Sequence, residues 1–75
     1  MKEVINFLKK NGFKRIEINS YANDMCNVKI ESCADEKYYA VADNEGNTCY
    51  SPNAEIYWLI GYLTYFGFID NIYKK

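Results

Sequence analysis

The chain has 75 residues, of which 49% are hydrophobic and 17% aromatic, and its formal net charge at pH 7 is −1. This length predicts one small domain spanning residues 1–75, with a thin core that buries about 60% of the unfolded surface. The apolar content excludes an intrinsically disordered chain. The near-neutral charge argues against strong general affinity for nucleic acid.

The N-terminal residues and the cysteines predict a cytoplasmic protein. The first ten residues alternate charged and apolar side chains, without the continuous apolar run of a secretory signal. Cys26, Cys33 and Cys49 have no C-x-x-C spacing, and the chain has no histidine. We therefore expect reduced thiols and no disulfide framework, zinc site or Cys–His nucleophile. The sequence predicts no catalytic residues, no metal and no cofactor.

The first predicted element is a helix over Lys2–Asn11. Val4 and Leu8 recur one turn apart on one face, as in an amphipathic helix. Gly12 supplies the left-handed residue that commonly follows a helix, and Phe13 is placed to fold back on Leu8. The sequence therefore predicts a Schellman motif at this end.

Between residues 14 and 50 the hydrophobic period changes to two, which is typical of strands. Residues 21–24, 32–36 and 43–47 are dense in turn formers, and the last of these predicts a hairpin. The fold class is therefore α+β, an antiparallel meander of three or four strands flanked by an N-terminal and a C-terminal helix on one face. The predicted strands are Lys14–Asn19, Cys26–Glu31, Tyr38–Ala42 and Asn47–Tyr50.

The most unusual segment is Ile56–Ile69, which has fourteen residues, six of them aromatic and none charged. It is too short for a membrane span, which needs about 20 apolar residues. Ser51 as N-cap and Pro52 at the first helical position predict where this helix starts. Gly67 ends it in the manner of the first helix, and residues 69–75 are expected to add one turn and a basic tail.

At about 100° per residue, this helix divides into two sides. We consider two explanations for the aromatic side. It forms a contact surface for a partner or a second copy, since Trp and Tyr are enriched at interface hot spots. Alternatively, the first helix and the C-terminal tail cover it within the monomer. The aliphatic side, expected in the core, holds Ile56, Leu59, Ile60 and Leu63, and the aromatic side holds Trp58, Gly61, Tyr62 and Tyr65.

Two charged clusters are further candidates. A basic cluster around the Gly12 turn could hold phosphates or RNA, or simply complement the dipole of the first helix. An acidic cluster around the hairpin turns could enter a basic groove, or serve solubility and turn formation. The 43–47 turn lacks the ligand spacing of a calcium loop. The basic cluster is Lys9, Lys10, Lys14 and Arg15, and the acidic cluster is Asp35, Glu36, Asp43 and Glu45.

The hairpin over residues 43–48, followed by the helical segment 56–63, resembles short proteins of bacteriophages and other bacterial mobile elements. The resemblance covers the C-terminal half and implies no activity for any particular residue. It implies a setting in which small proteins bind and block a host component, including nucleases of defence systems.

We therefore predict a non-catalytic protein–protein interaction module that works through the aromatic side of the second helix, with self-association as the simplest case. One alternative is an anti-CRISPR-like inhibitor of a host nucleic-acid enzyme, acting through the acidic cluster. Another is a weak nucleic-acid binder, acting through the basic cluster. We expect no membrane partner and no small-molecule ligand.

Overall fold

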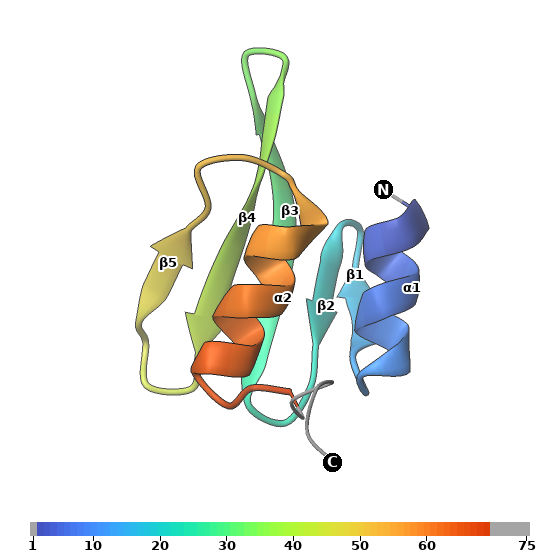
Figure 1. Ribbon diagram of the computed structural model, residues 1–75, viewed down its shortest axis with the longest axis vertical. Helices are drawn as coiled ribbons and strands as arrows, with labels where there is room; N and C mark the ends of the chain where they lie inside the picture. The colour runs from blue at the N-terminus through green and yellow to red at the C-terminus, as the bar shows by residue number, and fades with distance from the viewer. Residues whose placement is uncertain (1, 70–75) are drawn as a thin grey trace.

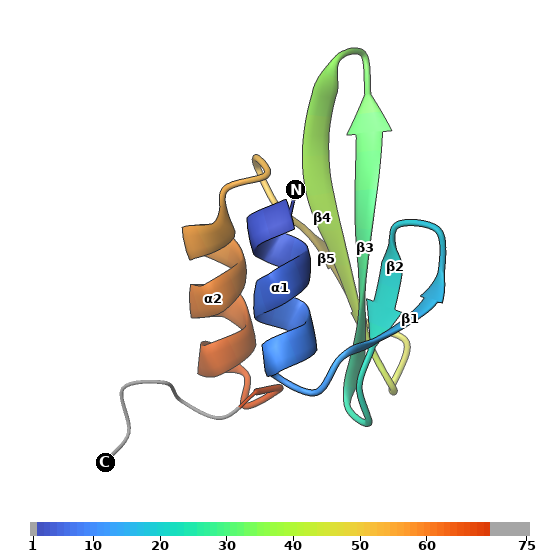
Figure 2. The ribbon, with the colours of Figure 1, turned by 90° about the vertical axis from the view of Figure 1, so that its right-hand side faces the viewer.

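The structure is a computed structural model, and it describes residues 2–69. Two helices lie side by side on one face of a single antiparallel sheet (Figures 1 and 2), which confirms the predicted α+β class. The sheet has one strand more than expected. The elements are α1 (Lys2–Lys10), β1 (Lys14–Glu17), β2 (Ser20–Ala22), β3 (Cys26–Cys33), β4 (Glu36–Asp43), β5 (Thr48–Tyr50) and α2 (Ile56–Tyr65).

The strands follow one another across the sheet in chain order, β1-β2-β3-β4-β5, and each neighbouring pair is antiparallel. Short hairpin turns connect them, so no crossover is needed. β3 and β4 are the longest strands, with eight residues each. Their hairpin projects beyond the rest of the sheet (Figure 1).

The predicted strand over residues 14–19 is present only in its first four residues. β1 ends at Glu17, the chain turns through Asn19 at φ 58°, and the expected turn at 21–24 instead begins with β2. Tyr21 explains the difference, because it lies opposite Val28 and is buried beneath the helices. The two isoleucines of the predicted strand stay outside, with Ile16 55% and Ile18 71% exposed. Burying the large ring of Tyr21 stabilises the fold more than leaving this residue in an exposed turn.

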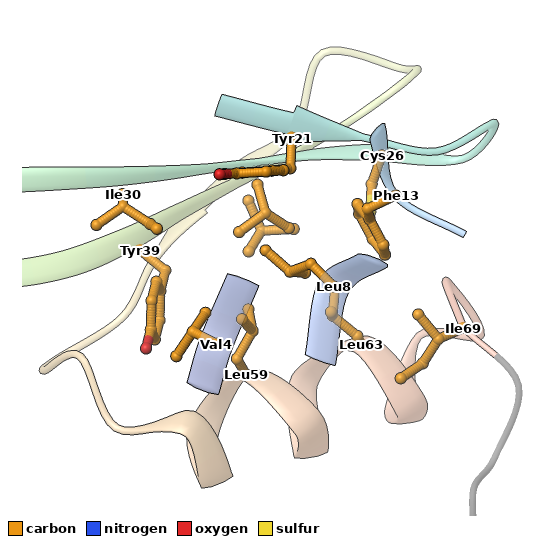
Figure 3. Packing of buried hydrophobic residues seen from close by; sticks show 12 residues of the cluster. Val4, Leu8, Phe13, Tyr21, Cys26, Ile30, Tyr39, Leu59, Leu63 and Ile69 are labelled. Atoms are coloured by element: carbon orange, nitrogen blue, oxygen red, sulfur yellow. The ribbon is translucent and has the colours of Figure 1, made fainter. Parts of the chain in front are cut away.

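The core fills the space between the sheet and the two helices (Figure 3). β3 shows the alternation expected of a half-buried strand, with every second residue buried from Cys26 to Ile30. α2 presents Leu59 and Leu63 to the core, both fully buried, while Ile56 and Ile60 are half-buried. The buried cluster comprises Val4, Leu8, Phe13, Tyr21, Cys26, Val28, Ile30, Tyr39, Val41, Leu59, Leu63 and Ile69.

Both helices end in the predicted Schellman motif. After α1, Gly12 has φ 86° and the Phe13 N–H donates to the Leu8 carbonyl at 3.0 Å. After α2, Gly67 has φ 74° and the Phe68 N–H donates to the Leu63 carbonyl at 2.9 Å. Glycine is needed at both positions because other residues are strained at positive φ. The predicted further turn and basic tail fall mainly on residues 70–75, outside the described part.

The predicted start of the second helix was wrong. α2 begins at Ile56, and its N-cap residue Glu55 makes no side-chain capping bond. The Ser51 hydroxyl is engaged elsewhere: it accepts a hydrogen bond from the Tyr39 N–H at 2.7 Å and donates one to the Asn53 carbonyl. The Ser51 N–H also donates to the Tyr39 carbonyl at 2.9 Å. Ser51 therefore extends the sheet beyond β5 and cannot cap a helix.

The three cysteines are free and differ in exposure: Cys33 is exposed, Cys49 half-buried and Cys26 buried. Burial, helped by the negative charge of Asp43, raises the pKa of the Cys26 thiol to about 12. Because the thiolate is the reactive species, this thiol is protected twice, by low access and by a low thiolate fraction.

We expect alkylation of the native protein with iodoacetamide near about pH 8 to be fastest at Cys33 and slower at Cys49. Cys26 should react only when the protein is unfolded. Peptide mass spectrometry after timed quenching measures the three rates, and a fully denatured sample gives the intrinsic rates for comparison. Modification of native Cys26 as fast as Cys33 would contradict the described packing.

Candidate protein-binding surfaces

The aromatic side of α2 divides into two parts that point in different directions. Trp58 and Tyr62, predicted together with Gly61 and Tyr65, are half-buried, whereas Gly61 and Tyr65 are exposed. At about 100° per residue the half-buried pair flanks the core-facing leucines, and the exposed pair points away from the sheet. The sequence therefore grouped residues that the structure separates.

The flanking pair, continued by Phe66 just beyond the helix, forms a row of neighbouring rings that we name the aromatic ladder: Trp58, Tyr62 and Phe66, spaced one turn apart. The ring centroids of Trp58 and Tyr62 are 4.9 Å apart with planes at 17°, and those of Tyr62 and Phe66 are 4.6 Å apart. Trp58 also stacks on Tyr39 of β4 at 6.4 Å. Such aromatic pairs add about 0.5–1.5 kcal/mol each beyond the area they bury.

Trp58 and Tyr62 of the aromatic ladder are covered by the sheet and not by the first helix, whereas Phe66 is 51% exposed. Burial raises the pKa of the Tyr62 hydroxyl, and the neighbouring Cys49 side chain of β5 raises it further. α1 lies on the other side of α2 (Figure 1). The Tyr39 hydroxyl donates to the Ala54 carbonyl at 2.6 Å, and burial raises its pKa. The ladder therefore belongs largely to the fold itself.

The outward part of α2 is a second row, which we name the outward stripe: Tyr57, Gly61 and Tyr65. Tyr57 is 79% exposed and Tyr65 is 82% exposed, and a side chain added at Gly61 would meet nothing within 4 Å. Tyr57 was not among the residues predicted from the sequence. Its spacing of four residues from Gly61 and eight from Tyr65 is the signal that identifies it, since such residues share one face.

The acidic cluster is also divided. Asp35 and Glu36 lie at the turn between β3 and β4, whereas Asp43 and Glu45 lie at the turn between β4 and β5. These turns are at opposite ends of β4 (Figure 1), about 25 Å apart for eight extended residues. No single acidic hairpin surface unites the four side chains.

At the second of these turns the acidic residues meet the end of the aromatic helix. Three segments converge there: the β2–β3 turn, the β4–β5 turn and the residues around the end of α2 (Figure 1). They enclose an open hollow of about 420 Å³, which we name the acidic hollow. Its lining residues are Asp24, Met25, Asp43, Asn44, Glu45, Phe66 and Phe68.

The basic cluster occupies one corner of the molecule, where α1 leads into β1. Lys9 and Lys10 lie in the last turn of α1, and Lys14 and Arg15 begin β1. All four side chains are exposed. Across the sheet, Lys14 lies opposite Ala22 and Arg15 opposite Tyr21 of β2.

Comparison with models of known protein families, with curated proteins and with solved structures found no match. Within residues 2–69, no group of three or more His, Cys, Asp or Glu side chains is placed to hold a metal ion. Neither of the described helices is long and apolar enough to cross a membrane. The two helix-associated surfaces, the outward stripe and the acidic hollow, therefore stand as the candidate binding sites on their geometry alone.

Proposed function

We propose that this protein is a non-catalytic interaction module that self-associates through the outward stripe of α2. The observation that carries the proposal is the pair of tyrosines exposed by about four-fifths on a helix without a single charged residue. The outward face of a helix on a globular domain ordinarily carries charge. Large aromatic side chains left in water are typical of contact surfaces.

The spacing of the stripe suits a second copy of the same chain. Tyr57 and Tyr65 lie four residues before and four residues after Gly61, about 12 Å apart along the helix. If two α2 helices pack antiparallel about a two-fold axis near Gly61, Tyr57 of one copy meets Tyr65 of the other, and the same contact recurs on the opposite side. The glycine permits close approach of the two backbones, and α2 carries no charged side chain that would repel the second copy.

The area of the stripe predicts a weak dimer. Two tyrosines, each able to bury about 150–250 Å², supply about 300–500 Å² per protomer. A stable interface buries about 800 Å² on each partner. We therefore expect a dissociation constant in the range of about 10 µM to about 1 mM.

The biological setting is part of the proposal. The resemblance to small proteins of phages and mobile elements supports action by binding and blocking a host component, and the free cysteines support a cytoplasmic location. Reversible self-association would leave the module available to such a component at low concentration. An unbiased capture experiment from the source cell's lysate would identify it.

Sedimentation analysis tests self-association. From about 10 µM to about 1 mM, we expect the average mass to rise from the monomer value of 8.8 kDa towards twice that value. Tyr65→Glu, and separately Tyr57→Glu, should keep the monomer mass across this range, since each places charges at the two-fold contact. Tyr62 is less suitable for this test because its ring is stacked within the aromatic ladder.

Two further variants separate the interface from the fold. Gly61→Ala should raise the stability of the monomer by up to about 1 kcal/mol through helix propensity, and Gly61→Gln should fold equally while blocking close approach of the helices. Ile18→Glu is the matched control, because it charges another large side chain that is 71% exposed. A constant monomer mass for the native protein would overturn the proposal. So would loss of the dimer in Ile18→Glu but not in Tyr65→Glu.

A further inference from the structure

We propose that the acidic hollow is a second binding site, which takes an arginine-bearing basic segment of a partner protein. This site is separate from the outward stripe and does not depend on self-association. It joins an apolar wall to a negatively charged rim. Long cationic side chains have both of the complementary parts, an apolar stem and a charged end.

The wall of the hollow is exposed apolar surface. Met25 is 47% exposed and Phe66 51% exposed, and Phe68 is half-buried beside them. The rings of Phe66 and Phe68 are stacked at 6.0 Å with planes at 20°. A planar guanidinium stacks on aromatic faces of this kind, and its stem packs against a thioether.

The rim of the hollow is negative. Asp24, Asp43 and Glu45 surround the wall, and no lysine or arginine is among the described residues that line it. Hydrogen bonds from Asn47 and Glu45 hold the pKa of Asp43 below its ordinary value, so this carboxylate remains charged in mildly acidic solution. Asp43 contributes its negative charge to the electrostatic potential of the hollow more than direct contacts with a ligand. Its oxygens already accept three hydrogen bonds from Glu45 and Asn47. Asp24 and Glu45 are the exposed carboxylates that reach a ligand.

The hollow is built in advance of any ligand. The Asn23 side chain donates to the Phe68 carbonyl at 2.9 Å and so ties the β2–β3 turn to the end of α2. The Asn44 side chain donates to the Asp24 carbonyl at 2.9 Å and ties the same turn to the β4–β5 turn. A site fixed in this way loses little conformational entropy on binding.

The probe is an acetylated, amidated peptide of alternating glycine and arginine with three arginines. Its titration into the isotope-labelled protein is followed through backbone amide shifts. We expect saturable shifts at Met25, Asn44, Glu45 and Phe66, with a dissociation constant in the range of about 0.1–1 mM. The lysine analogue should bind several-fold more weakly, and an analogue with citrulline in place of arginine should not bind.

Matched double variants decide whether the site is specific. Asp24→Asn with Glu45→Gln should weaken binding of the arginine peptide about tenfold, since charge-assisted bonds at two carboxylates are lost. Asp35→Asn with Glu36→Gln removes the same two charges at the far end of β4 and should leave the affinity within about twofold. Equal losses in both variants would show general electrostatic attraction and overturn the proposal. Absence of saturable shifts would overturn it too.

Two other occupants give distinguishable results. If a second copy occupies the hollow, dilution of the protein alone will move the Met25 and Glu45 amides, and Tyr65→Glu will not prevent this. If residues 70–75 of the chain occupy it, Lys74→Ala with Lys75→Ala will move the same amides without peptide. Either result would overturn the assignment to a partner's basic segment. Failure of self-association alone would leave it unaffected.

Discussion

Leu63→Ala is expected to lower the free energy of unfolding by about 2–5 kcal/mol. Leu63 is fully buried where α2 crosses the core, and the backbone around it is also fixed, since its carbonyl accepts the Phe68 N–H at the helix end. A domain of this size has a total stability of only about 4–11 kcal/mol. The substitution therefore removes a large fraction of it.

Urea titration, followed by the fluorescence of Trp58, the single tryptophan, measures this loss. Trp58 is a suitable reporter because it stacks on both Tyr39 and Tyr62. Ile18→Ala, which truncates a side chain that is 71% exposed, is the control and should change the stability by less than about 0.5 kcal/mol. A loss below about 1 kcal/mol in Leu63→Ala would mean that α2 is not docked as described.

Ser51→Ala is expected to cost about 1–3 kcal/mol, although it removes one oxygen atom only. Ser51 is only 7% exposed, and its hydroxyl accepts a hydrogen bond of 2.7 Å from the Tyr39 N–H in the buried part of β4. Without it, this buried donor loses its partner. The loop between β5 and α2 would also lose the bond from the hydroxyl to the Asn53 carbonyl.

Two measurements identify this mechanism. Urea unfolding gives the loss of stability, and amide hydrogen exchange should show faster exchange at Tyr39 than in the native protein. Ser32→Ala removes the same atom from an exposed position of β3 and should have little effect on either quantity. Unchanged exchange at Tyr39 together with unchanged stability would contradict the role assigned to the Ser51 hydroxyl.

Features that depend on a few neighbouring residues were predictable from the sequence. Both helix ends follow from a leucine, a glycine four residues later, and the phenylalanine after it, because the Schellman motif is a local backbone arrangement. In the central hairpin, β3 follows from alternation and β4 follows from its run of strand-forming residues. β2 was not predictable in this way, because three residues are too few to show an alternating hydrophobic pattern. Tyr21 also becomes buried only when the helices cover it. The start of α2 failed for a similar reason, since Ser51 bonds to a residue twelve positions earlier.

The candidate sites show the same division. The sequence predicts that the charge-free, aromatic-rich segment forms one helix, and the structure confirms that helix as α2. Which of its aromatic residues are exposed depends on where β5 lies, so the sequence wrongly grouped Trp58 and Tyr62 with Gly61 and Tyr65 and left out Tyr57. The acidic hollow draws on residues 24–25, 43–45, 66 and 68. No local pattern joins these segments, and only the folded sheet brings them together.

The strict chain order of the strands has a consequence for how the protein reaches its native state. Every pairing in the sheet joins neighbours along the chain, so each closes through a short hairpin and has a low entropic cost. Among the described elements, the longest closure is the docking of α2 beside α1, which lies at the other end of the sequence. The meander can therefore assemble by successive zippering, and the two helices complete the core afterwards. A topology of this kind belongs to the faster-folding group of mixed domains.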